Sequence, residues 1–204
     1  ALHVFGGPDH LAFLLGLFLI MRSTRDILVL VLGFTIGHTF SMLLAHLSNT
    51  TPDMTMVESL IGFSILLIAL EAVQDRTKTT NIALWTLPLC LVAAVLALSH
   101  GWPNSIGFLG LGLSAYCYLT LPQRLRSTPL IRIGITVFFG LVHGFGFTNS
   151  FAQTELSNGN AIMWLFSFNA GVELGQLVVV TTFFLCLLAA RQLRLSHITA
   201  PITQ

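Results

Sequence analysis

Residues 1–15 read ALHVFGGPDHLAFLL, a short polar stretch that runs directly into an apolar segment. Gly-Gly-Pro at 6–8 lies between His3 and the Asp9-His10 pair, so the backbone can turn tightly and bring the three side chains together. Neutral imidazoles beside a carboxylate suit nickel, cobalt, zinc or copper. The same residues also fit a plain helix start with His10 at a membrane interface. Residues 1–15 alone leave both interpretations open.

The composition is typical of a membrane protein. Of the 204 residues, 54% are hydrophobic and only 8% are charged, whereas a soluble domain carries roughly a quarter charged residues. The formal net charge of +1 gives no sign of nucleic-acid binding, so we expect no nucleic-acid partner. The cysteines, Cys90, Cys117 and Cys186, lie in apolar segments without ligand spacing, and we expect them to be packing residues.

Seven apolar segments are long enough, or nearly so, to cross a bilayer as helices. The first is the weakest, because Gly and Pro interrupt its start, and the last is long enough to extend beyond the membrane. The sequence therefore predicts an all-α fold, a polytopic bundle of seven transmembrane helices in a single domain, residues 1–204. The predicted spans are 5–22, 26–47, 55–75, 82–99, 104–121, 131–152 and 162–190.

The positive charges predict the orientation of this bundle. All of them follow the first, third, fifth and seventh segments, and none lies in the other loops or at the N-terminus. Seven spans then place every basic residue on one side of the membrane, as the positive-inside rule requires. We therefore expect the N-terminus outside and the C-terminus inside. The basic residues are Arg22, Arg25, Arg76, Lys78, Arg124, Arg126, Arg132, Arg191 and Arg194.

Glycines recur at a spacing of four residues within three of the predicted spans. Small residues at this spacing let helix backbones approach closely in a membrane, where no hydrophobic effect drives helix packing. We therefore interpret these pairs as helix contacts. They are Gly33/Gly37, Gly140/Gly144 and Gly171/Gly175.

Three ionisable side chains fall well inside predicted spans: His38, His143 and Glu173. Each costs roughly 2.5–3.5 kcal/mol at bilayer depth on insertion scales, so each needs a reason. His38 and His143 lie on the order of 14 Å below the outer surface at 1.5 Å per residue. With His10 they can share the outer half of the bundle. A carbonyl group or Glu173 itself could instead satisfy a buried histidine.

Other polar residues accompany these three. Asn169, Glu173 and Gln176 form one polar stripe on a helix, and Thr35, His38 and Ser41 form a shorter one. We expect Ser41, Glu58, Asn169 and Gln176 to support the metal ligands, although a carboxylate at Glu58 also suits a helix start. For Glu71 and Asp75 we expect neutralisation of Arg76 or Lys78. All of these residues lie within or next to the predicted spans.

Five blocks of the sequence resemble those of the HupE/UreJ family, whose members are bacterial membrane proteins regarded as nickel or cobalt permeases. The resemblance implies metal binding at His3, Asp9 and His10, and it matches His38, His143 and Glu173 to intramembrane polar positions. It also implies a multi-pass location in the bacterial cytoplasmic (inner) membrane. The blocks are GPDHLAFL (7–14), FTIGHT (34–39), VESLIGFSI (57–65), FGLVHGFGF (139–147) and FNAGVELGQL (168–177).

The predicted function is a permease, not an enzyme, whose substrate is a divalent transition-metal ion. Nickel or cobalt is favoured, and zinc or copper fits the same ligands. One alternative is an intramembrane zinc-dependent hydrolase that uses three histidines, an aspartate and Ser41. Another is a metal-binding sensor or accessory subunit. Besides the ion and the lipid bilayer, we consider a second copy of the chain or an accessory subunit as partners.

Overall fold

The computed structural model describes residues 8–21, 23–48, 52–78, 82–101, 105, 107–147 and 161–199. Within these ranges every regular element is a helix, which confirms the predicted all-α class. The helices are α2 Pro8–Ile20, α3 Thr24–Ser48, α4 Met54–Thr77, α5 Ile82–Ser99, α6 Gly107–Thr120, α7 Gln123–Arg126, α8 Pro129–Phe145 and α10 Ala161–Thr199.

Most predicted spans coincide with a helix to within three residues at both ends. The sixth differs, because α8 ends at Phe145 with Gly146 as its C-cap, and 148–152 of that prediction lie outside the described residues. The seventh continues as a helix to Thr199. The short helix α7 is an addition that the sequence did not predict. It follows Pro122, and the hydroxyl of Ser127 donates to a carbonyl in its first turn.

Four of the described helices are long and apolar enough to cross a membrane. They contain the spans Arg25–Ser48, Met54–Thr77, Ile82–Ser99 and Leu165–Ala190. Helices α2, α6 and α8 are apolar but shorter, with 13, 14 and 17 residues, or about 20–26 Å against a hydrocarbon core of about 30 Å. The chain is a multi-pass membrane protein, and seven spans with an outer N-terminus stay a prediction.

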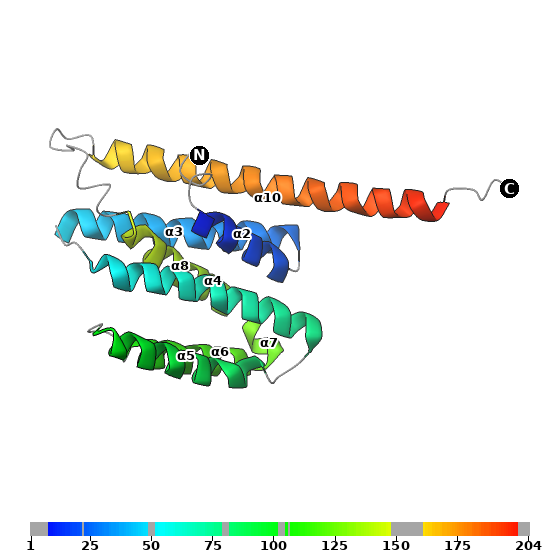
Figure 1. Cartoon of the computed structure of the whole chain (residues 1–204). Coiled ribbons are helices and arrows are strands. Elements are labelled where there is room, and N and C mark those ends of the chain that lie inside the picture. The colour runs from blue at the N-terminus through cyan, green and yellow to red at the C-terminus, as the bar shows by residue number, and fades with distance from the viewer. Residues whose placement is uncertain are drawn as a thin grey trace.

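The helices lie side by side with nearly parallel axes (Figure 1). Helix α3 packs against α8, and α2 packs against α4. Helices α5 and α6 pair with each other at one edge of the bundle, whereas α10 lies against α3 and α2 at the opposite edge and projects beyond it. The interior therefore lies where α2, α3, α4 and α8 meet.

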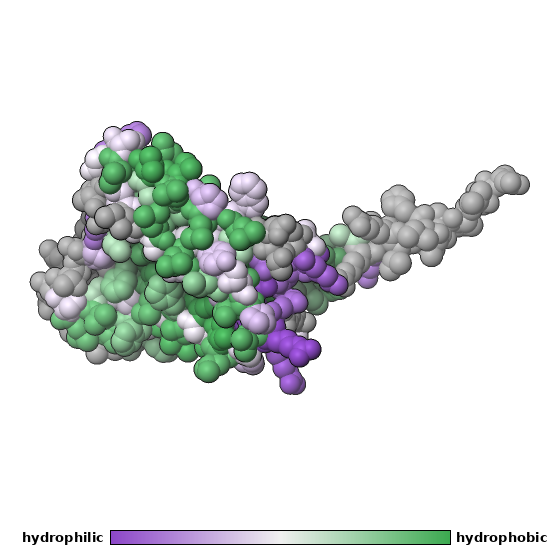
Figure 2. Space-filling view, turned by 90° about the horizontal axis from the view of Figure 1, so that it is seen from below, coloured by the Kyte–Doolittle hydropathy of each residue, from purple (hydrophilic) through white to green (hydrophobic). Residues whose placement is uncertain are grey.

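The outer surface of the bundle is apolar. On α5, Trp85 is 73% exposed and Leu98 is 65% exposed. Figure 2 shows hydrophobic residues over much of one face, with hydrophilic residues gathered toward one end. Exposed apolar surface of this extent is typical of a protein that contacts lipid.

Helices α3 and α8 cross with their backbones in contact, and glycines permit this. A Cβ atom at Gly37 would collide with the carbonyl oxygen of Val137, and one at Gly140 would collide with that of Phe34. At Gly144 a Cβ would collide with the hydroxyl of Ser41 and the carbonyl oxygen of His38. The interpretation of these glycine pairs as helix contacts is confirmed for α3 and α8, while the pair on α10 stays a prediction.

Two arginines are buried at the opposite end of the bundle from the start of α4. Arg126 of α7 lies 3.0 Å from a carboxylate oxygen of Asp75 and 3.8 Å from one of Glu71. Arg126 is thus a partner of both carboxylates, and the expected neutralisation of Arg76 or Lys78 stays a prediction. Arg132 of α8 forms an ion pair with Asp26 of α3. These pairs join α4 to α7 and α3 to α8.

Candidate functional site

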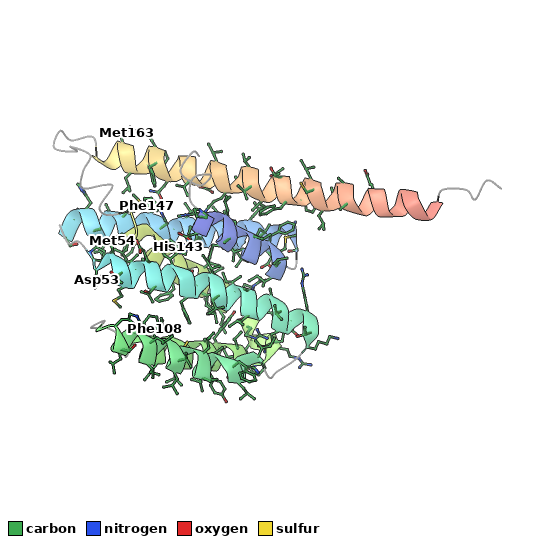
Figure 3. The ribbon with its side chains drawn as sticks, in the orientation of Figure 1. Asp53, Met54, Phe108, His143, Phe147 and Met163 are labelled. Carbon is green, nitrogen blue, oxygen red and sulfur yellow. The ribbon has the colours of Figure 1, made fainter. Side chains whose placement is uncertain are left out.

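Three histidines from three helices meet inside the bundle, and we call them the histidine cluster. The ring centroid of His10 on α2 lies 6.2 Å from that of His38 on α3 and 5.5 Å from that of His143 on α8. Their exposed fractions are 4%, 0% and 0%. Figure 3 shows His143 within the bundle, nearer the end at which Asp53 caps α4. The sequence assigns these three histidines to one metal site, and the structure brings them together.

Asn169 of α10 determines which nitrogen of His38 carries the proton. Its side-chain nitrogen donates to the carbonyl oxygen of Leu165 at 2.8 Å, so its side-chain oxygen faces Nδ1 of His38 at 3.2 Å. That oxygen can only accept a hydrogen bond, and Nδ1 of a neutral His38 must therefore donate. The Nε2 lone pair of His38 is consequently the one available to a metal ion.

His143 is held in the same tautomer by its own helix. Its Nδ1 lies 2.8 Å from the carbonyl oxygen of Phe139, an acceptor that cannot donate. Its Nε2 is buried and makes no hydrogen bond within the described part of the chain. A buried nitrogen acceptor without a hydrogen bond is costly unless it serves a ligand. The carbonyl, and not Glu173, satisfies the other nitrogen, Nδ1.

The predicted polar stripes of α3 and α10 face each other. Besides the pair His38–Asn169, the hydroxyl of Thr35 lies 3.2 Å from the side-chain oxygen of Gln176. Gln176 is 1% exposed. Ser41 is also fully buried, but its hydroxyl donates to the carbonyl oxygen of His38 in its own helix. Asn169 thus bonds to the imidazole ring of His38, whereas Ser41 bonds to the backbone of the same residue.

Aromatic rings surround the cluster, and the sequence analysis did not identify them. Phe34 lies 6.0 Å from His38 and 5.0 Å from His143 between ring centroids. Phe147 lies 5.9 Å from His10 and 5.8 Å from His38. A signal was present, because Phe precedes His by four residues on both α3 and α8. The rings exclude water, which strengthens electrostatic interactions at the imidazoles.

The other predicted ligands that the structure describes, and the expected supporting residue Glu58, are more exposed than the three histidines. Asp9 and Glu58 are exposed, and Glu173 is partly exposed. His3 lies outside the described residues. Asp9 is nevertheless adjacent to His10 at the start of α2. The structure thus places Asp9 at the edge of the cluster, not within it.

The ring of His10 lies at a distance from each of the other two histidine rings that is close to the spacing a shared metal ion imposes. Within the described ranges, no three His, Cys, Asp or Glu side chains are arranged to hold a metal ion. A tetrahedral ion bonded to two imidazoles at about 2.0–2.1 Å would hold the ring centroids about 5 Å apart. The observed separations of 5.5 and 6.2 Å are near this value.

Comparison with known proteins identifies one family. A family model described as HupE / UreJ protein matches residues 1–120 and 112–203, which together cover nearly the whole chain. No curated protein and no solved structure matches the chain.

Proposed function

Because the chain belongs to the HupE/UreJ family, we propose that it is a permease that carries a divalent transition-metal ion across the bacterial cytoplasmic membrane. Nickel and cobalt are the favoured substrates, since a site rich in neutral imidazole suits both ions. Zinc and copper are the alternatives that the same ligands accept. In this proposal the ion is cargo, and the chain is not an enzyme.

The observation that carries the proposal is the shared tautomer of His38 and His143. Both Nδ1 atoms face an acceptor, Asn169 or the carbonyl of Phe139, so both Nε2 atoms carry the lone pair. Two Nε2 lone pairs among phenylalanine rings suit a cation that binds nitrogen. His10 supplies the third imidazole. We assign these three histidines as the ligands of the transported ion.

The other predicted ligands have supporting positions in this proposal. We assign Asp9, and His3 ahead of it, to capture of the ion at the entrance, because Asp9 is exposed beside His10. Glu173 lies one helical turn beyond Asn169 on α10 and is partly exposed. We propose that Glu173 binds the ion after the ion leaves the histidines, or that it orients a residue that does.

We further propose seven spans with the N-terminus outside. The support is that all nine basic residues then lie on the inner side. The histidine cluster lies in the outer half in this orientation, and the buried arginines lie in the inner half.

Uptake into proteoliposomes tests the proposal. We expect inward flux of Ni²⁺ or Co²⁺ to saturate with ion concentration. In His143→Asn the flux should fall more than tenfold, because loss of a group that merely orients a metal ligand already lowers affinity or activity about 10–100-fold. The matched control is His100→Ala, because His100 is exposed and its Nδ1 bonds to its own helix end.

One result would contradict the permease, and another would contradict the assignment of the histidines as its ligands. Metal binding with no uptake of any of the four ions would favour a sensor or accessory subunit. Equal uptake by His143→Asn and the unmodified protein would exclude the histidine cluster from the path.

A further inference from the structure

Three packed phenylalanines form a layer against one side of the histidine cluster. Phe13 lies 4.8 Å from Phe34 and 5.9 Å from Phe139 between ring centroids. Their exposed fractions are 1%, 1% and 3%. The centroids of Phe13 and Phe34 each lie 5.0 Å from that of His143. The layer therefore contacts the cluster directly.

A small, partly open cavity of about 10 Å³ lies on the other side of this layer. Each of the three helices contributes a residue to its wall, about one turn beyond its phenylalanine. The order along each helix is histidine, phenylalanine and cavity residue: His10, Phe13 and Leu17 on α2; His38, Phe34 and Leu30 on α3; His143, Phe139 and Thr136 on α8. The layer thus separates the histidine cluster from the cavity.

The cavity is polar at its far side. Glu71, Tyr118 and Arg132 line it together with Thr136. The hydroxyl of Tyr118 donates to a carboxylate oxygen of Glu71 at 2.9 Å, and Arg132 donates to the carbonyl oxygen of Ile20 at 3.0 Å. Buried charges inside a membrane protein are costly and usually mark a path for ions or substrate.

One face of α8 joins the two polar regions. Arg132, Thr136, Phe139 and His143 are spaced i, i+4, i+7 and i+11, so they share a face, and all four are buried. The ends of this series are about 16 Å apart at 1.5 Å per residue. The phenylalanine interrupts a polar line that otherwise runs from the histidine cluster to the buried arginines.

We infer that Phe13, Phe34 and Phe139 are a closed hydrophobic gate between the histidine cluster and the Glu71 cavity. This inference rests on the proposed function, since it makes the cavity the next part of the ion's path. Packed aromatic rings exclude water, and a constriction without water is a barrier to a hydrated cation. Displacement of one ring opens the way from the imidazoles to Thr136 and Glu71.

Thiol labelling tests the gate without any metal. The three native cysteines are replaced (Cys90→Ala, Cys117→Ser, Cys186→Ser), and Thr136→Cys places one thiol in the cavity wall. A charged methanethiosulfonate is added to intact cells and, separately, to inverted membrane vesicles. With the phenylalanines in place we expect slow labelling from the histidine side. Phe139→Ala should raise that rate by at least about tenfold, because water then reaches the cavity.

Phe138→Ala is the matched control, because Phe138 is adjacent on α8 but 54% exposed. It should leave the labelling rate unchanged. Phe139→Leu keeps an apolar side chain of smaller size and should give an intermediate rate, which guards against misfolding of the alanine variant. The gate would be overturned if Phe139→Ala left the labelling rate unchanged. It would also be overturned if Phe138→Ala raised that rate as much as Phe139→Ala does.

The outcome is independent of the proposed function. Labelling that rises only in Phe139→Ala, in a protein that fails to take up any metal ion, would keep the gate and reject the permease. Normal uptake with unchanged labelling would reject the gate and keep the permease.

Discussion

At the level of single residues, Asn169 fixes the ring of His38 through one hydrogen bond. The bond assigns the proton to Nδ1, so the lone pair of the neutral ring lies on Nε2. The spacing of the polar stripes predicted that Asn169 and His38 accompany the site. The hydrogen bond between Asn169 and Nδ1 of His38 could not be predicted. A polar stripe on one helix does not specify how the neighbouring helix is rotated about its own axis.

Replacement of Asn169 should weaken metal binding. We expect Asn169→Ala to lower the affinity for Ni²⁺ about 10–100-fold, as loss of a group that orients a ligand histidine typically does. Asn169→Asp retains an oxygen acceptor for Nδ1 and should preserve most of the affinity. Equilibrium dialysis of the purified protein measures both, with Gln192→Ala on the exposed part of α10 as control. An unchanged affinity in Asn169→Ala would show that this hydrogen bond does not act on the site.

At the level of helices, the crossing of α3 and α8 positions two of the three histidines. His38 contacts the glycines on either side of His143 through its backbone, at Gly140 and Gly144. The position of His143 relative to His38 thus depends on the absence of Cβ atoms. A methyl group at Gly140 must push the helices apart.

Gly140→Ala should therefore destabilise the protein and weaken the metal site together. We expect a loss of about 1–3 kcal/mol, the usual range for overpacking a tight contact, seen as a lower Tm in detergent. Gly134→Ala on the same helix is the control, because nothing lies within 4 Å of a Cβ there. Equal melting temperatures for the two variants would mean that the backbones are not in contact.

The sequence predicted the helices better than their contacts. Long apolar runs predicted α3, α4 and α5 almost to the residue, because burial of backbone groups in lipid requires continuous helices. Helix α7 has four residues and no apolar run, so hydropathy could not indicate it. The sequence did not predict the phenylalanine layer, because phenylalanine is as common at positions that face lipid as at positions inside a helix bundle. Only the packing distinguishes buried Phe139 from exposed Phe138.

At the level of the whole molecule, the proposed orientation in the membrane rests on the distribution of charge. In a protein without native cysteines, we expect an impermeant thiol reagent outside the cell to label Ser48→Cys. It should not label Thr77→Cys. Both positions are exposed, at the ends of α3 and α4. Because α3 and α4 are consecutive spans with an outer connection, the reverse pattern would contradict the outer N-terminus.

The central claim is that histidine nitrogens hold the transported ion, and X-ray absorption spectroscopy of the Ni²⁺-loaded protein tests it most directly. The account predicts nitrogen ligands with the multiple scattering of imidazole rings, because His10, His38 and His143 supply the donors. It predicts that this signal falls in His143→Asn and persists in His100→Ala. A spectrum of oxygen ligands alone, identical in the unmodified protein and His143→Asn, would contradict the account.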